Sequence, residues 1–71
     1  MYNQLIREAL AKQGRIGVEP RHVEAFMRLE FGTLDGVCNW DRAVREAADG
    51  VVAAGPGLSE ELALSYGLRA R

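Results

Sequence analysis

The sequence predicts an all-α protein: a compact small helical bundle of three main helices plus a shorter C-terminal helix, in a single domain of residues 1–71. Three observations lead to this fold class. Apolar residues recur at intervals of three and four along most of the chain, which is the period of an amphipathic helix. No segment alternates apolar and polar residues as a half-buried strand does. Glycine and proline separate the periodic segments, so the loops are short, as between antiparallel helices.

Residues 2–13 form the first predicted helix. Glu8 precedes Lys12 by four residues, the spacing at which opposite charges pair on a helix surface. Gly14 stops this helix, and the connector RIGVEP places Pro20 just before or at the first turn of the next one. The residues expected to face inward are Tyr2, Leu5, Ile6, Ala9 and Leu10.

The second predicted helix covers residues 21–31 and ends at Gly32. Glu24 and Arg28 have the spacing of an ion pair. In the following segment TLDGVCN, the DG dipeptide suits a tight turn and Asn39 is a candidate N-cap for the next helix. The inward residues are expected to be Val23, Phe26, Met27 and Phe31.

The third predicted helix has the strongest periodicity in the chain. Its inward face consists of Trp40, Ala43, Val44, Ala47, Ala48, Val51 and Val52. Its other face has charges four residues apart, which predicts the surface ion pairs Asp41–Arg45, Arg42–Glu46 and Arg45–Asp49. Gly50 costs about 1 kcal/mol inside a helix, so it either marks a bend or allows a neighbouring backbone to come close.

The GPG segment at 55–57 is expected to end the third helix, and Ser59 is expected to cap the last one. Leu58 is expected to pack back on this helix, which carries apolar Leu62, Tyr66 and Leu68. The segment LSEELALSYGLRAR reads like the first half of a helix-turn-helix, but the four residues after Gly67 cannot form a recognition helix. The second and third helices could form such a motif instead, yet the charged face of the third is mixed rather than basic.

Catalytic, cofactor and metal sites have no candidate residues. Cys38 is the only cysteine and His22 the only histidine, so neither a disulfide nor a thiolate-rich zinc site can form within the chain. His22 and Glu24 form an H-x-E pair as in zinc deaminases, but the accompanying P-C-x-x-C segment is missing. We therefore interpret His22 as a surface residue and Cys38 as a small buried or half-buried thiol, and expect no enzyme activity.

Two aromatic residues and three arginines are of the types that dominate protein-binding hot spots. These candidate partner-binding residues are Arg28, Trp40, Arg42, Arg45 and Tyr66. For Trp40, a place in the core and a place in an interface are alternatives of equal weight. Arginine supplies eight of the nine basic residues, which either reflects a GC-rich genome or suits bidentate contacts at an interface.

The run RHVEAFMRLEFGTLDGV, followed by an alanine-rich helix in a short arginine-biased chain, resembles small helical proteins of bacterial phages and other mobile elements. The resemblance covers residues 20–55 and transfers no functional residue. One class of such proteins, the anti-CRISPR inhibitors, is similar in size and in its lack of catalytic residues. The resemblance implies a protein that binds and blocks a bacterial host complex.

The expected function is therefore stoichiometric protein binding without catalysis, with a bacterial defence complex as the partner. The alternatives are a small nucleic-acid-binding regulator and a structural or assembly subunit; a homodimer would help so small a core. A net charge of −1 gives no basic excess for nucleic acid. No apolar run approaches the roughly 18 residues of a membrane span, and the first residues lack a signal-peptide pattern, so we expect a cytoplasmic protein.

Overall fold

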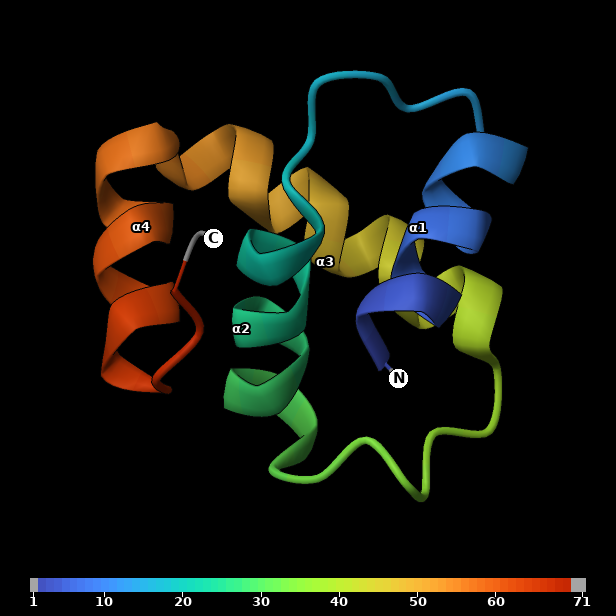
Figure 1. Cartoon of the computed structure of the whole chain (residues 1–71). Helices are drawn as coiled ribbons and strands as arrows, with labels where there is room; N and C mark the ends of the chain where they lie inside the picture. Colours follow the sequence, from blue (N-terminus) through green and yellow to red (C-terminus); the bar gives the residue numbers. More distant parts are fainter. Residues whose placement is uncertain (1, 70–71) are drawn as a thin grey trace.

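A computed structural model describes residues 2–69 as four α-helices: α1 (Tyr2–Lys12), α2 (Pro20–Phe31), α3 (Trp40–Ala54) and α4 (Pro56–Ser65). The predicted all-α class is confirmed, since these residues contain no strand. Helices α2 and α3 each pack against every other helix, whereas α1 and α4 do not contact one another. Figure 1 shows α3 passing behind α2, with α1 and α4 on opposite sides of α2. The radius of gyration is 10.8 Å, close to the about 11 Å expected for a folded chain of this length.

The core forms where α1, α2 and α3 meet. Ile6, Val23, Met27 and Val44 are fully buried there, and Leu34 closes it from the loop between α2 and α3. The four helical residues are among those that the helical period placed inward, whereas Leu34 was not predicted. Helix α4 is attached differently, because its buried side chains are the small residues Ser59 and Ala63 rather than large apolar ones. None of the described helices is both long and apolar enough to cross a membrane.

The end of α2 and the start of α3 are formed by the residues that the sequence predicted for these positions. Gly32 adopts a φ of 76° after α2, and its N–H donates to the carbonyl of Arg28. Asn39 is the predicted N-cap of α3: its side-chain oxygen accepts a hydrogen bond of 3.1 Å from the N–H of Arg42. The predicted Glu24–Arg28 ion pair is also formed, with a distance of 2.8 Å.

The predicted start of α4 at Ser59 is wrong. The helix begins at Pro56, because Gly55 alone makes the turn with a φ of 88° and proline is well suited to the first helical position. Ser59 instead lies inside α4, where its side chain is buried and its hydroxyl donates to the carbonyl of Val51 at 3.4 Å. Leu58 does not pack back on the helix but is exposed.

Four further expectations about side-chain direction are also corrected. Val52 is 66% exposed, because α3 turns Val51 rather than its neighbour toward the core near the end of the helix. Phe31 and Leu5 were expected inward but are about 40% exposed. Phe31 is the last residue of α2 and lies beyond the reach of the core. Cys38, expected buried or half-buried, is exposed in the loop before α3.

The predicted charge pairs on α3 are only partly formed. Arg42 and Glu46 pair at 3.1 Å as expected. Asp41 instead pairs with Lys12 at 3.0 Å, and Asp49 with Arg15 at 2.6 Å. Both cations belong to α1 or the loop after it, so tertiary contacts replace the pairs expected within α3. For the same reason Lys12 does not pair with Glu8.

Gly50 lies where α3 meets a neighbouring side chain rather than a backbone. A Cβ built on Gly50 would stand 3.1 Å from Cδ1 and 3.3 Å from Cε1 of Phe26. The sequence left open a bend or the close approach of a neighbouring backbone, but the group that comes close is the aromatic ring of Phe26 from α2. The absence of a side chain at position 50 is what allows this ring to come so close to α3.

Candidate protein-binding site

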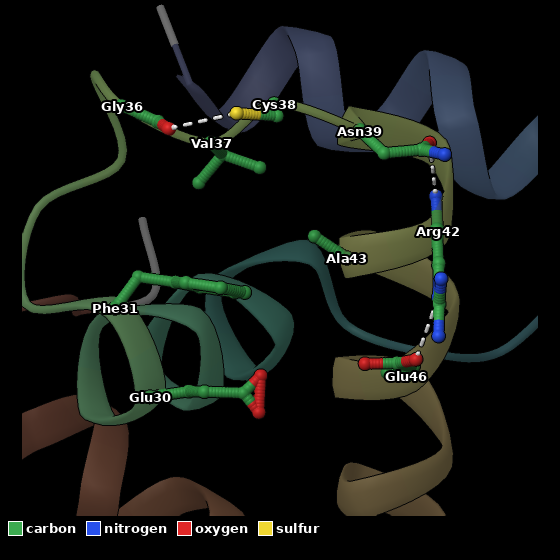
Figure 2. A pocket seen from close by; sticks show the side chains of 9 residues that line it. All are labelled: Glu30, Phe31, Gly36, Val37, Cys38, Asn39, Arg42, Ala43 and Glu46. Atoms are coloured by element: carbon green, nitrogen blue, oxygen red, sulfur yellow. Dashed lines mark hydrogen bonds and ion pairs between the residues drawn. The ribbon is translucent and has the colours of Figure 1, made fainter.

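The described residues form an open groove between the last turn of α2, the loop of residues 32–39 and the first turns of α3. We call it the α2–α3 groove; its volume is about 350 Å³. Figure 2 shows side chains from both helices and from the loop pointing toward this space. The lining residues are Glu30, Phe31, Gly36, Val37, Cys38, Asn39, Arg42, Ala43 and Glu46.

The inner surface of the α2–α3 groove is apolar. Phe31, Val37 and Ala43 form it, and Phe31 is 42% exposed although it is a large aromatic side chain. Three of the polar lining groups are already engaged within the chain: Asn39 caps α3 and Arg42 pairs with Glu46. The groove therefore offers apolar contact area with a charged rim, rather than a set of free hydrogen-bonding groups.

An aromatic cluster lies at the same end of the molecule, where the first turn of α1 meets the start of α3 (Figure 1). We define it as Tyr2, Trp40 and Arg28. The rings of Tyr2 and Trp40 stack with centroids 6.1 Å apart, and the guanidinium of Arg28 lies 5.7 Å from the centre of the Tyr2 ring. The indole N–H of Trp40 donates to the carbonyl of Leu5 at 3.3 Å. Trp40 is half-buried and packs against the core, so it takes part in both the core and the surface.

The structure brings together some of the predicted partner-binding residues and separates others. Arg42 lines the α2–α3 groove, and Arg28 and Trp40 belong to the aromatic cluster. Arg45 is exposed on α3 but does not line the groove. Tyr66 follows α4, on the opposite side of α2 from α1, and is 40% exposed there. The five residues therefore do not form one continuous site.

Sequence reasoning missed Phe31, Glu30 and Cys38 as groove residues. A signal was present for Phe31: it is a large aromatic residue at the last position of a helix, followed at once by glycine. A side chain at the end of a helix often extends past the core. No comparable signal marks Glu30 or Cys38, because their place in the groove depends on how the loop returns to α3.

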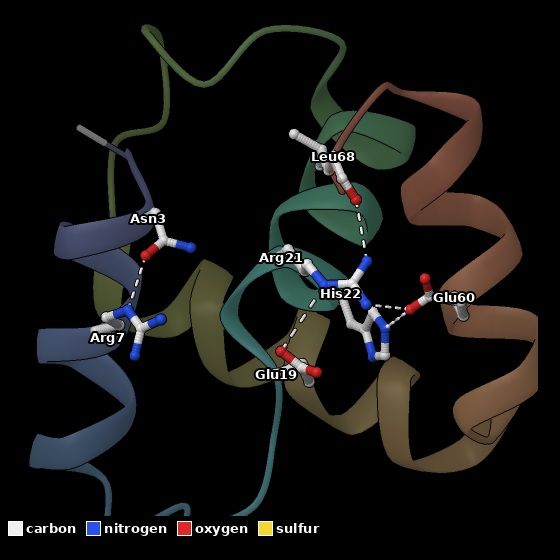
Figure 3. A network of polar contacts seen from close by, with 7 residues as sticks. All are labelled: Asn3, Arg7, Glu19, Arg21, His22, Glu60 and Leu68. Carbon is white, nitrogen blue, oxygen red and sulfur yellow. Dashed lines mark hydrogen bonds and ion pairs between the residues drawn. The ribbon is translucent and has the colours of Figure 1, made fainter. Parts of the chain in front are cut away.

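A polar cluster joins α2 to α4 (Figure 3). His22 was predicted at the surface but is buried, and its Nε2 lies 2.9 Å from Oε1 of Glu60. Arg21 donates to the same carboxylate and, at 3.0 Å, to the carbonyl of Leu68. The prediction failed because α4 covers the first turn of α2, which no pattern within α2 reveals. We call Arg21, His22 and Glu60 the α2–α4 clamp.

The charges of the clamp stabilise one another. The hydrogen bond from Arg21, and then that with His22, lowers the pKa of Glu60 from its ordinary value of 4.5. The hydrogen bond with Glu60 raises the pKa of Arg21 in turn. Because Arg21 and His22 both bond to Glu60 of α4 and Arg21 also donates to Leu68, the arrangement holds α4 and the segment after it against α2. It is a structural link rather than a reactive site.

In the described part of the chain, the side-chain arrangement suits neither a metal site nor a cysteine nucleophile activated by histidine. Within residues 2–69, no three His, Cys, Asp or Glu side chains are grouped so that they could hold a metal ion. His22 is engaged in the clamp, whereas Cys38 lies in the α2–α3 groove, of which His22 is not a lining residue. A Cys–His pair of the kind that activates a thiolate is therefore not assembled between these two residues.

No protein-family model matches the chain, and neither a curated protein nor a solved structure matches it.

Proposed function

We propose that this protein acts by stoichiometric binding of a partner protein, without catalysis, and that the α2–α3 groove is the centre of the binding surface. The observation that supports this most directly is the exposed apolar lining of the groove around Phe31. The partner we propose is a bacterial defence complex, which the protein would block as phage and mobile-element inhibitors do. That part of the proposal rests on the sequence resemblance alone.

The size of the molecule favours an interface that extends beyond the groove. A standard protein interface buries about 800 Å² on each partner, which is about one sixth of the 4599 Å² of accessible surface here. The groove and the neighbouring aromatic cluster lie at one end of the bundle. Together they offer Phe31, Trp40 and Arg42, and aromatic and arginine side chains supply most of the energy in such interfaces.

A nucleic-acid-binding role is the less favoured alternative. The net charge is −1, and the exposed face of α3 mixes Asp41 and Glu46 with Arg42 and Arg45. Such a face attracts phosphates weakly. A self-assembling structural subunit is the other alternative, and it is favoured by exposed apolar residues away from the groove, such as Ile16, Val52 and Leu58.

A pull-down with matched variants tests the proposal. Tagged protein is incubated with lysate of a bacterium that has defence systems, and light scattering gives the oligomeric state of the purified protein. We expect one complex to be retained in stoichiometric amount. Phe31→Ala should weaken its binding about thirtyfold, as loss of a hot-spot side chain does. Leu58→Ala is the control, because Leu58 is an exposed apolar residue on α4 that does not line the groove.

Circular dichroism checks that both variants keep the helical fold. If the two variants retain the complex equally well, the groove is not the binding site. If the wild-type protein retains no partner and only self-associates, the structural alternative replaces the proposal. Tight, salt-sensitive retention of nucleic acid would instead establish the regulator alternative.

A further inference from the structure

The charges around the α2–α3 groove select the chemistry of what can enter it. Glu30 projects from α2 and Glu46 from α3; Figure 2 shows the Glu30 carboxylate directed toward the space between the two helices and the Glu46 carboxylate next to Arg42 on α3. Arg42 pairs with Glu46 at 3.1 Å and offsets its charge. Within residues 2–69, Glu30 takes part in no ion pair. The lining therefore carries one net negative charge, located mainly at Glu30.

The interior of the groove accepts an apolar group rather than a polar one. Phe31, Val37 and Ala43 present carbon surface, while the Asn39 oxygen is engaged in capping α3. A volume of about 350 Å³ is near the lower end of the range of ligand pockets, about 300–1,000 Å³, and suits one or two side chains. A polar small molecule would find few free groups to orient it. A phosphate would face the unpaired carboxylate of Glu30.

We propose that the α2–α3 groove binds a segment of the partner protein that places an aliphatic side chain against Phe31 and a lysine or arginine beside Glu30. The aliphatic group covers the exposed ring and the apolar lining. The basic group supplies a positive charge that pairs with the Glu30 carboxylate. The Arg42–Glu46 pair stays intact. This inference rests on the proposed function, since it specifies the partner segment that the same surface recognises.

Selection from a displayed library of random short peptides tests this on the purified full-length chain. The wild-type protein should enrich peptides that have an aliphatic residue close to Lys or Arg. The Glu30→Lys variant should lose that enrichment and favour Asp or Glu at the basic position. Glu61→Lys is the matched control, because Glu61 is exposed on α4 and takes part in none of the ion pairs of residues 2–69. It should select the same peptides as the wild type.

Fluorescence anisotropy on the most enriched peptide then gives the size of the effect. Glu30→Lys should bind it about three- to tenfold more weakly than the wild type, as expected for reversing one exposed ion pair, and Glu61→Lys should bind it unchanged. No enrichment, enrichment of acidic peptides by the wild type, or the same peptides selected by Glu30→Lys would each overturn the inference. If the pull-down partner still depends on Phe31 in any of these cases, protein binding stands and only the basic-segment inference fails.

Discussion

Replacing Gly50 with alanine sets two effects of opposite sign against each other in the interior of α3. Alanine removes the conformational cost of a helical glycine, which stabilises the folded state by about 0.5 to 1 kcal/mol. The new methyl group, however, would lie 3.1 Å from Cδ1 of Phe26 and 3.3 Å from Cε1. Carbon atoms in good contact are about 3.5 to 4.0 Å apart, so the ring has to withdraw by about half an ångström.

The steric effect should be the larger of the two. Overpacking a filled site costs about 1 to 3 kcal/mol. Phe26 is only partly buried and can move toward solvent, which places the cost in the lower part of that range. A steric cost of about 1.5 kcal/mol, less the gain of about 0.5 to 1 kcal/mol, means that Gly50→Ala should lower the free energy of unfolding by about 0.5 to 1 kcal/mol. For a domain of this size that corresponds to a fall of about 2 to 8 °C in Tm.

A double-mutant cycle isolates the contact. Thermal and urea unfolding are measured for Gly50→Ala in the wild type and in a Phe26→Leu background, where the aromatic ring is absent. In that background the same alanine should stabilise by about 0.5 to 1 kcal/mol. Gly57→Ala is the control, because a Cβ there meets no atom within 4 Å, and it should also stabilise. A Gly50→Ala effect that is identical in both backgrounds, or as stabilising as Gly57→Ala, would refute the steric argument.

Two further predictions concern single polar groups. Asn39→Ala should lower the free energy of unfolding, measured by urea denaturation, by about 1 kcal/mol, because the hydrogen bond that caps the Arg42 N–H is lost. Asn39→Asp should stay near the wild type. An equal loss in both variants would mean that the cap is not the cause. The lowered pKa of Glu60 gives stability that is complete above 4.5 and is lost as the pH falls further through the folded-state pKa. Thermal midpoints of Glu60→Gln should therefore depend less on pH in that acid range than those of the wild type, and parallel curves would contradict the role of the clamp.

The number of helices and their rough extent could be predicted because they depend on local information. Apolar spacing of three and four residues shows which segments can bury one face, and Gly32 and Asn39 act through bonds to residues within the same turn. The start of α4 was wrong for an instructive reason. The GPG segment combines residues that often break helices, yet one glycine suffices for the turn and the proline fits the first position of the next helix.

The candidate site could be predicted only in its residue types. Tryptophan and arginine indicated an interface, and the structure places Arg42 in the groove and Trp40 next to it. Phe31 has the same helical period as a core residue and was interpreted as one. Phe31 is the last residue of α2, and its exposure depends on the path of the loop that follows.

The sequence by itself determined the all-α class, the helical segments and most of the core, since these follow from the spacing of apolar residues and from the chemistry of glycine, proline and asparagine within a few residues. Only the tertiary structure decided which charges pair, because Asp41 and Asp49 are reached by cations from α1 and its loop rather than by Arg45. It likewise decided that His22 is buried under α4 and that Phe31 and Glu30 face an open groove. Contacts between segments far apart in the chain depend on how helices cross, and the period of a single helix contains no information about that.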